Sequence, residues 1–429
     1  MKVLMFGWEF PPHISGGLGT ACYGIVKGLH SVGDVDVIFV VPKLFGDEEK
    51  DSFKLISAED IDINYKIFDL SSFFNNVIFF EVNSTLRPYA TVDEYYKIIN
   101  ELKQNQSFLT NKSSPERLKF SGGYGSNLFQ EIFNYAIVSA NLVISQDFDV
   151  IHAHDWLTFP AGIVAKKITG KPLILHVHAT EFDRSGGNIN PDVFNIEKHC
   201  LEEADQIITV SNFTRNILIE KYEIDPQKIV TVHNAVEPLN FTINEPLKKP
   251  VKEKIVTFLG RITLQKGPEY FIEAANLVLK KTKNVRFVMA GSGDMLQKMI
   301  LRVATLGIGD RFHFTGFLKG DDVYKMYRIS DVYVMPSISE PFGIAPLEAI
   351  QSNVPVIISK QSGVSEVLKY AIKVDFWDIH AIADAIYALI NYEGLPQVFK
   401  LYGKEEVDNL KWEDTARKIK ELYCKLIKN

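Results

Sequence analysis

The sequence has few cysteines and no spacing that would put them to use. Its three cysteines, Cys22, Cys200 and Cys424, are odd in number and far apart. They therefore predict neither a disulfide framework nor a CxxC metal site. Such sparing use of cysteine is typical of a reducing, cytosolic compartment.

Long apolar runs are missing as well. No uninterrupted apolar stretch approaches the ~18 residues that a membrane-spanning helix requires. The opening MKVLMFGWEFPP has one lysine and about five apolar residues before a glutamate and two prolines, which is too short for a signal sequence. It is typical of a buried strand, and we expect no stable membrane insertion.

An excess of positive charge is also absent. The formal net charge of −6 and the pI near 6.0 argue against a nucleic-acid surface. The 46% hydrophobic and 23% charged content is that of a packed globular protein rather than a disordered one. A length of 429 residues suits two or three domains.

Alternating strand and helix patterns predict an α/β fold. KVLMFGW, a glycine-rich turn, the helical pattern TACYGIVKGLHSVG and the strand VDVIFVVP together make a βαβ unit. Further buried strands are expected at DVIHAH, PLILHVHA and DQIITVS. After residue 250 the rhythm restarts with EKIVTFLG, NVRFVMAG, RFHFTGF, DVYVMPS and VPVIIS. The pattern predicts two successive doubly wound, Rossmann-like domains.

The expected domains are 1–240 and 250–411, followed by an amphipathic helix, 412–429, that could pack back on the first domain. The break falls in the polar, proline-bearing stretch 240–254. Residues 44–130 interrupt the rhythm and are expected to be either extra packing or a functional insertion. They are rich in aromatic residues: Phe73, Phe74, Phe79, Phe80, Tyr89, Tyr95, Tyr96 and Tyr124.

Two loops after predicted strands suit a phosphate. In SGGLGT, residues 15–20, backbone N–H groups at a helix start can approach an anion; a plain tight turn is the alternative, and on its own this loop is a weak signal. A dinucleotide fingerprint read from Gly17 fails at Cys22. In GRITLQKG, Arg261 and Lys266 combine a guanidinium fork with a mobile ammonium, which suits a diphosphate; a solvated surface pair is the alternative.

Carboxylates and histidines follow two other strands. Glu340 and Glu348 lie in SISEPFGIAPLEAI, where a helix beginning near Gly343 would place Glu348 in its second turn. One carboxylate could face a sugar ring and the other could accept hydrogen bonds from a ribose. His154 in HAHDW is either a pocket residue or a structural histidine; a zinc site would lack a third local ligand, so we predict no metal.

In this order the motifs resemble the GT-B retaining glycosyltransferases, especially the glycogen and starch synthases. The resemblance spans nearly the whole chain and rests on WEFPPHISGGLGT, HAHDW, TVSNFTR, VHNAVE, FLGRITLQKG, AGSGD and SEPFGIAPLE, with its Glu-x7-Glu spacing. It implies two Rossmann-like domains facing a cleft, a nucleotide-sugar donor and a carbohydrate acceptor. It also implies that no metal or other cofactor is needed, because arginine and lysine take over the charge role of a divalent ion. Bacterial glycogen synthases carry a lysine two positions before the Gly-Gly pair; the segment from His13 to Gly16 has none, which leaves the donor base open.

The resemblance also assigns roles to residues. Gly17 would donate its N–H to the diphosphate, Arg261 and Lys266 would neutralise it, and Glu348 would bind the ribose. The transferred sugar would contact Glu340 and His154, and the remaining donor-side residues would be Phe317, Leu318, Gly343 and Asn212. On the acceptor side, Tyr124 in KFSGGYGSNLF is a candidate aromatic platform.

The leading prediction is a cytosolic enzyme that transfers glucose from ADP- or UDP-glucose to an α-glucan. One alternative is a transferase that builds a surface polysaccharide or a glycolipid. Another is a nucleotide-sugar-binding protein without catalysis, against which the presence of Glu340, His154, Arg261 and Lys266 counts.

Overall fold

The computed structural model describes residues 1–14, 16–48, 53–63, 117–125, 127–238, 249 and 251–428. Ser15 of the first glycine loop and most of the predicted break 240–254 lie outside these residues. So do most of the aromatic residues noted in 44–130: Phe73, Phe74, Phe79, Phe80, Tyr89, Tyr95 and Tyr96.

The first half of the chain is built on a seven-stranded parallel sheet with the order β3-β2-β1-β4-β5-β6-β7. Its central strands are buried almost throughout, because helices cover both faces of the sheet. The strands are β1 (Lys2–Phe6), β2 (Asp36–Val41), β3 (Lys54–Ser57), β4 (Val150–His154), β5 (Leu173–Val177), β6 (Gln206–Thr209) and β7 (Ile229–Thr231).

Helices pack on both faces of this sheet. One face is covered by α4 (Leu128–Ser145), α5 (Phe159–Thr169) and α7 (Pro191–Glu203), and the other by α1 (Gly17–Val32) and α16 (Trp412–Lys428). The shorter α6 (Glu181–Ser185) and α8 (Asn212–Lys221) follow β5 and β6 at the sheet's carboxyl edge. By length and composition α4 could cross a membrane, but 56% of its apolar window is buried here and it packs against α5. A core helix accounts for its apolar character.

The second half has a six-stranded parallel sheet with the order β10-β9-β8-β11-β12-β13. Its strands are β8 (Lys254–Leu259), β9 (Val285–Ala290), β10 (Phe312–Gly316), β11 (Val332–Met335), β12 (Val356–Ser359) and β13 (Ile372–Val374). The helices around it are α9 (Pro268–Lys281), α10 (Leu296–Thr305), α11 (Asp321–Ile329), α12 (Ala345–Gln351), α13 (Val364–Val367), α14 (Ile379–Asn391) and α15 (Gly394–Asp408).

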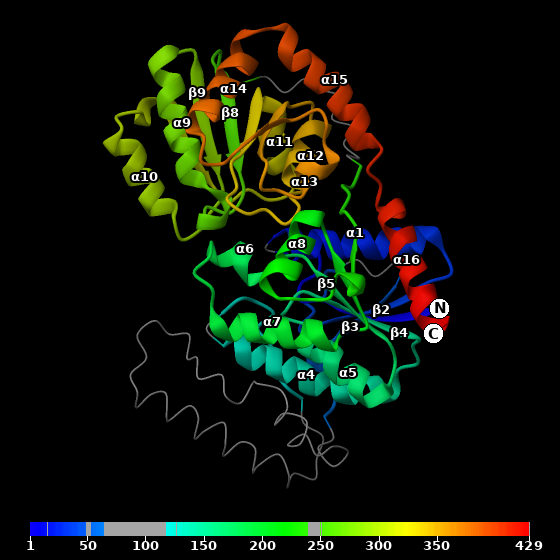
Figure 1. Cartoon of the computed structure of the whole chain (residues 1–429). Helices are drawn as coiled ribbons and strands as arrows, with labels where there is room; N and C mark the ends of the chain where they lie inside the picture. The colour runs from blue at the N-terminus through cyan, green and yellow to red at the C-terminus, as the bar shows by residue number, and fades with distance from the viewer. Residues whose placement is uncertain are drawn as a thin grey trace, which may run out of the picture.

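The predicted α/β fold class is confirmed, since both sheets are parallel and each carries helices on its faces (Figure 1). All the strands expected from apolar runs are present. Three further strands, β3, β7 and β13, were not predicted, and all three are edge strands of three or four residues. Their residues are only partly buried, so they lack the continuous apolar run that marks the equally short central strands.

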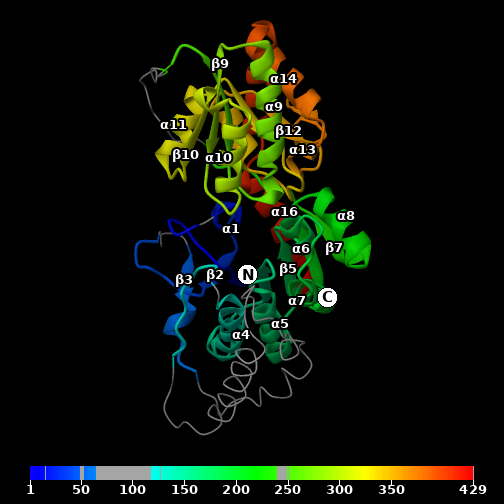
Figure 2. The same ribbon diagram turned by 90° about the vertical axis from the view of Figure 1, so that its left-hand side faces the viewer.

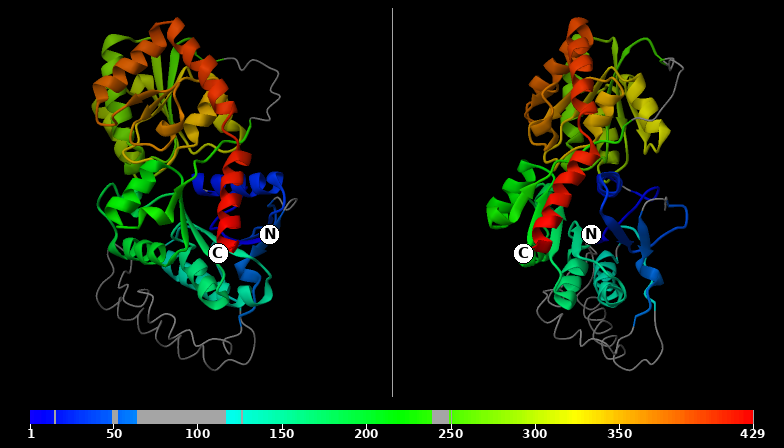
Figure 3. Two further views of the ribbon diagram at one scale, coloured as in Figure 1. Left: turned by 45° about the vertical axis from the view of Figure 1, so that its right-hand side comes forward. Right: turned by 90° about the vertical axis from the view of Figure 1, so that its right-hand side faces the viewer.

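The last helix returns from the second half to the first, where α16 crosses over α1 and packs against it (Figure 3). The approach is close: a Cβ on Gly24 would lie 2.1 Å from the Trp412 ring, and a Cβ on Gly28 would lie 2.5 Å from the Trp412 carbonyl oxygen. Tyr423 of α16 reaches the sheet, where its hydroxyl lies 2.6 Å from Nδ1 of His152. Glycines at these two positions of α1 therefore let the helices pack at backbone distance.

The carboxyl ends of strands from both sheets meet where the two halves join (Figure 2). Ser211, which follows β6, donates its hydroxyl to the Pro341 carbonyl after β11 at 2.5 Å. Asp183, in α6 after β5, accepts a hydrogen bond from Ser339. Since ligands of open parallel sheets bind at these strand ends, the candidate site lies at this junction.

Candidate functional site

Arg261 and Lys266 lie on the loop that follows β8. Gly260 adopts φ +156, and the exposed Arg261 guanidinium donates to Gln265 Oε1 at 3.3 Å. A short 3-10 turn, η4 (Leu264–Lys266), ends at Gly267, which has φ +63 and would place a Cβ 2.1 Å from the Pro336 carbonyl oxygen. Only glycine fits this close, left-handed position. The η4 turn is therefore pressed against the end of β11, beside the segment that carries Glu340.

Glu340 is 6% exposed and forms an ion pair with Lys266. Its carboxylate also accepts from the Ser337 hydroxyl at 3.2 Å, and its backbone N–H donates to the Gln361 carbonyl at 3.0 Å. The side chain thus points toward the lysine loop from the neighbouring strand. A buried carboxylate is costly unless it is paired, and Lys266 supplies that partner. Two residues predicted for the donor side are brought into direct contact.

Glu348 lies in the first turn of α12, because that helix begins at Ala345 rather than near Gly343. Gly343 has φ +99, which a helix cannot contain, and Pro346 suits the first helical turn. Burial raises the pKa of Glu348 to about 7, although a hydrogen bond from the Tyr327 hydroxyl at 3.4 Å acts in the opposite direction.

Gly17, Phe317 and Leu318 are placed at three other chain segments. Gly17 is the first residue of α1, and a Cβ built there meets no described atom within 4 Å, so the helix start faces open space. Phe317 follows β10, is 54% exposed and lies under the Lys319 ammonium at 5.8 Å. Leu318 is half-buried and packs on a small cluster around β8 and β9. Their donor-binding roles stay predictions.

His154 lies at the end of β4 and is fully buried. Its Nδ1 is 3.0 Å from Nε2 of His178, and its Nε2 has no hydrogen-bond partner among the described residues. His178 comes just after β5, two residues beyond His176, which is the register partner of His154, and therefore lies farther toward the carboxyl edge of the sheet. Burial lowers the pKa of His178 to about 3 and that of His154 well below its usual range, so both rings are neutral at physiological pH.

Sequence reasoning missed His178 as a site residue. The signal was present in HVHAT: His176 and His178 alternate at a strand end just as His152 and His154 do on the neighbouring strand. Because His154 and His176 are register partners in parallel strands, the four rings share one face of the sheet.

Three groups of side chains have metal-ligand geometry within the described residues: two are buried around His154, and the third, His13, Asp47 and Glu48, is largely exposed. Ring nitrogens of His152, His154 and His176 lie within 4.8 Å of one another, as do ligand atoms of Cys22, His154 and His178. The sequence lacked a third local ligand, and the fold brings candidates from β5 and α1. The rings nevertheless stack on one another, with His152 and His176 at 4° between their planes. The prediction that the chemistry needs no metal stays a prediction.

Asn212 and Tyr124 lie in two separate segments of the first half, at the start of α8 and in the loop before α4. Asn212 begins α8, and its backbone N–H and its side-chain amide donate to Glu366 of the second half at 2.9 and 3.1 Å. His233 Nε2 lies 2.8 Å from the same carboxylate, so Glu366 joins the two halves. Tyr124 is half exposed in a glycine loop whose backbone donates to the buried Glu131. Neither placement tests the predicted sugar or acceptor contact.

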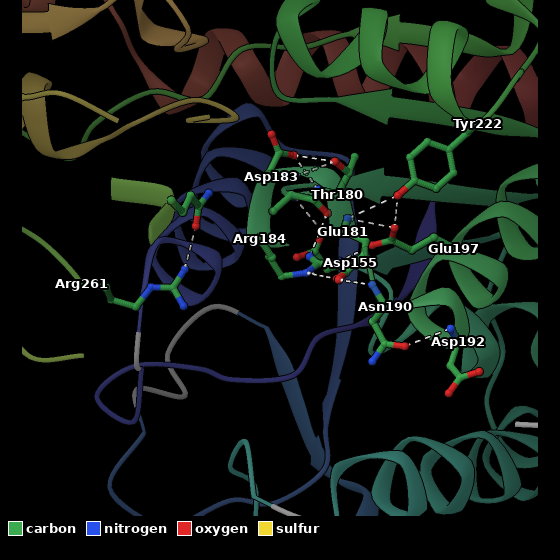
Figure 4. A network of polar contacts seen from close by, with 12 residues as sticks. Asp155, Thr180, Glu181, Asp183, Arg184, Asn190, Asp192, Glu197, Tyr222 and Arg261 are labelled. Carbon is green, nitrogen blue, oxygen red and sulfur yellow. Dashed lines mark hydrogen bonds and ion pairs between the residues drawn. The ribbon is translucent and has the colours of Figure 1, made fainter. Parts of the chain in front are cut away.

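A buried polar network fixes α6 beside the site (Figure 4). Arg184 forms ion pairs with Glu197 and Glu181, and Glu197 also accepts from the Tyr222 hydroxyl. Burial raises the pKa of Glu197 to about 7, against the opposing influence of Arg184. Figure 4 also shows Asp155, whose carboxylate accepts from the His178 and Ala179 N–H groups at 2.8 and 3.1 Å. These ion pairs and hydrogen bonds hold the strand ends in place, so we assign these groups a structural role rather than a ligand-binding one.

Comparison with known proteins covers both halves of the chain. Residues 240–406 match the family model described as glycosyl transferases group 1, and residues 113–238 match the model described as glycosyltransferase family 4. An uncharacterized glycosyltransferase of Methanocaldococcus jannaschii is 28% identical, covering 99% of this chain and 98% of that protein. The D-inositol 3-phosphate glycosyltransferase of Salinispora tropica is 26% identical, covering 64% of each chain.

Further similarities extend to an Escherichia coli protein and to solved structures. The UDP-Gal:alpha-D-GlcNAc-diphosphoundecaprenol alpha-1,3-galactosyltransferase of Escherichia coli is 26% identical, covering 67% of this chain and 78% of its own. Sucrose-phosphate synthase from Thermosynechococcus elongatus has a TM-score of 0.72 at 17% identity, covering 99% of this chain and 98% of that one. HepE of Anabaena with UDP-glucose has a TM-score of 0.65 at 15% identity, covering 99% and 100%. At such identities the structures show a shared fold.

Proposed function

We propose that this chain is a GT-B glycosyltransferase of group 1, which transfers a glycosyl residue from a nucleotide-diphosphate sugar bound at the carboxyl edge of its second sheet. The observation that carries the proposal is the grouping of Arg261 and Lys266 on the loop after β8 with Glu340 on the loop after β11. Two cations beside a paired carboxylate suit a leaving diphosphate next to a sugar.

The charge that develops as the donor breaks decides which role we assign to each site residue. Departure of the nucleotide diphosphate builds negative charge on its oxygens, and preorganised cations there lower the barrier; one such donor contributes on the order of 3 kcal/mol. We assign that role to Arg261 and Lys266, with the N–H of Gly17 approaching from the other half. Glu348 accepts from the ribose hydroxyls, and Glu340 accepts from a hydroxyl of the transferred sugar. We infer same-face attack, with the departing phosphate accepting the proton of the acceptor hydroxyl.

For the substrates, we propose ADP- or UDP-glucose as donor and an α-glucan as acceptor. The support is the order of the motifs along the chain and, for UDP-glucose, the related fold of HepE bound to that molecule. A second candidate is a transferase for lipid-linked or surface glycans, which is favoured by the similarity to a galactosyltransferase named for a diphosphoundecaprenol acceptor. Cytosolic location stays a prediction from three free thiols.

The test is a panel of ADP-, UDP- and GDP-sugars, scored for release of nucleotide diphosphate with and without glycogen or maltooligosaccharides. We expect release that glucan stimulates and that Arg261→Ala lowers about 100-fold or more. Arg302→Ala is the matched control, because Arg302 lies on α10 in an exposed ion pair with Glu273. Stimulation by lipid-linked sugars alone would replace the glucan with the second acceptor class. Nucleotide binding without turnover on any acceptor would leave a non-catalytic binding protein.

A further inference from the structure

The segment that carries Glu340 is hydrogen-bonded to the first half of the chain on both sides of that residue. On one side the Ser339 hydroxyl donates to Asp183 Oδ1 at 2.5 Å. On the other side the Pro341 carbonyl accepts from the Ser211 hydroxyl at 2.5 Å. Asp183 and Ser211 are both fully buried. The residue between these two contacts is the carboxylate proposed to face the sugar, so its main chain is located by residues of the other half.

The lysine loop rests on the same element. A Cβ on Gly186, the residue that ends α6, would lie 2.8 Å from Cδ2 of Leu264, the first residue of η4. That turn ends at Lys266, two residues later. Both partners of the Lys266–Glu340 ion pair are therefore in segments that contact α6 or its cap.

Asp183 serves two segments with its two oxygens. Oδ2 accepts from the Thr180 N–H and hydroxyl, both at 2.7 Å, which closes the capping box at the start of α6. Oδ1 is thereby directed toward Ser339 of the second half. The ion pair of Arg184 with Glu197 attaches α6 to the neighbouring helix α7. Because α6 is held by these contacts, it can fix the position of the segment that it contacts.

We propose that Asp183 is a positioning residue that holds Glu340 against Lys266 through Ser339, so that the donor-side pair is fully ordered only while the two halves are in contact. This inference rests on the proposed function, in which both members of the pair act on the donor. Separation of the halves breaks the Ser339 contact, which links the catalytic geometry directly to domain closure.

Ser339→Ala tests this arrangement, because it removes the contact between the halves and leaves the capping box of α6 intact. Ser339→Thr keeps a hydroxyl and is the conservative rescue. Thr415→Val is the matched control: it removes one buried hydroxyl, which donates to the His233 carbonyl at 2.8 Å, away from Glu340. For each variant kcat, KM for the donor, the Kd for UDP or ADP and the backbone hydrogen exchange of residues 337–343 are measured on the full chain.

We expect Ser339→Ala to lower kcat about tenfold or more, as for loss of a hydrogen bond to a charged group, with the nucleotide Kd within about twofold. Exchange at 337–343 should become faster, and Ser339→Thr should restore both values. A kcat within twofold of wild type, unchanged exchange, or an equal loss in Thr415→Val would each overturn the inference. Should the wild-type chain show no transfer from any donor, the proposed function fails, and the exchange data still decide whether Ser339 orders the segment.

Discussion

Glu348 is the residue whose replacement should separate stability from donor binding most clearly. Burial raises its pKa from 4.5 to about 7. In the unfolded chain the group ionises above about 4.5, whereas in the folded protein it keeps its proton up to about 7. Between these values the folded state binds more protons, so this group lowers stability as the pH rises through that window. At about 1.4 kcal/mol per pH unit, the unfavourable contribution above pH 7 is about 3 kcal/mol.

Glutamine at this position keeps an oxygen that can accept from the Tyr327 hydroxyl and has no charge to bury. We therefore expect Glu348→Gln to be more stable than wild type by as much as about 3 kcal/mol at pH 8.5 and nearly equal to it at pH 4.5. Urea unfolding at the two pH values measures this difference, and the exposed Glu405→Gln on α15 is the control. Because other buried carboxyls also titrate, the difference between variant and wild type is the informative quantity.

The same substitution should weaken donor binding. A hydrogen bond to a charged group contributes about 1.5–3 kcal/mol, so the Kd for UDP or ADP should rise roughly 10- to 100-fold. Calorimetry with the nucleotide alone measures this, since no acceptor is needed. A variant that is no more stable at pH 8.5, or that binds nucleotide as tightly as wild type, would refute the reasoning for stability or for the ribose contact respectively.

Two further substitutions probe the junction and its support. Gly363→Ala would place a Cβ 2.1 Å from the Pro341 carbonyl oxygen and 2.5 Å from Ser211 Cβ, so we expect it to push the two halves apart. Small-angle scattering should then show a larger radius of gyration, and kinetic assays should show a lower kcat. Arg184→Met leaves the Glu197 carboxylate, which is 3% exposed, without its ion-pair partner and should lower the free energy of unfolding by about 3–5 kcal/mol. Circular dichroism should show this as a lower melting temperature, and Arg417→Met, at an exposed arginine, is the control. Unchanged scattering in the first variant, or equal melting temperatures in the second pair, would contradict these expectations.

Most of the fold could be predicted because parallel strands covered by helices on both faces appear in the sequence as short runs of mostly apolar residues. Runs such as KVLMF and VIHAH are buried along almost their whole length, and a helix-length segment separates each from the next strand. The meeting of the Arg261–Lys266 loop with Glu340 could be predicted for a related reason, whereas the roles of these residues at a donor stay predictions. All three lie on loops that follow strands, and the carboxyl ends of parallel strands share one edge.

What sequence reasoning could not reach depends on contacts between distant segments. Ser339 and Asp183 are 156 positions apart and follow strands of different sheets, so no local pattern joins them. The burial of His154 was equally hidden, because it depends on α1 and α16 covering that face of the sheet. The start of α12 was placed two residues early because the positive φ of Gly343 is a tertiary requirement, set by the closeness of Glu340 and Met335.

The ion pair between Lys266 and Glu340 also orders the events in the proposed reaction. Lys266 forms an ion pair with a carboxylate that is almost fully buried, so neither charge stands alone. An arriving diphosphate carries more negative charge than one carboxylate and competes for the same ammonium. As Lys266 turns to the phosphate, Glu340 loses its cation and keeps, of the donors in the described part of the chain, the Ser337 hydroxyl 3.2 Å away. A sugar hydroxyl then becomes the natural replacement, so binding of the diphosphate prepares Glu340 to receive the sugar attached to it.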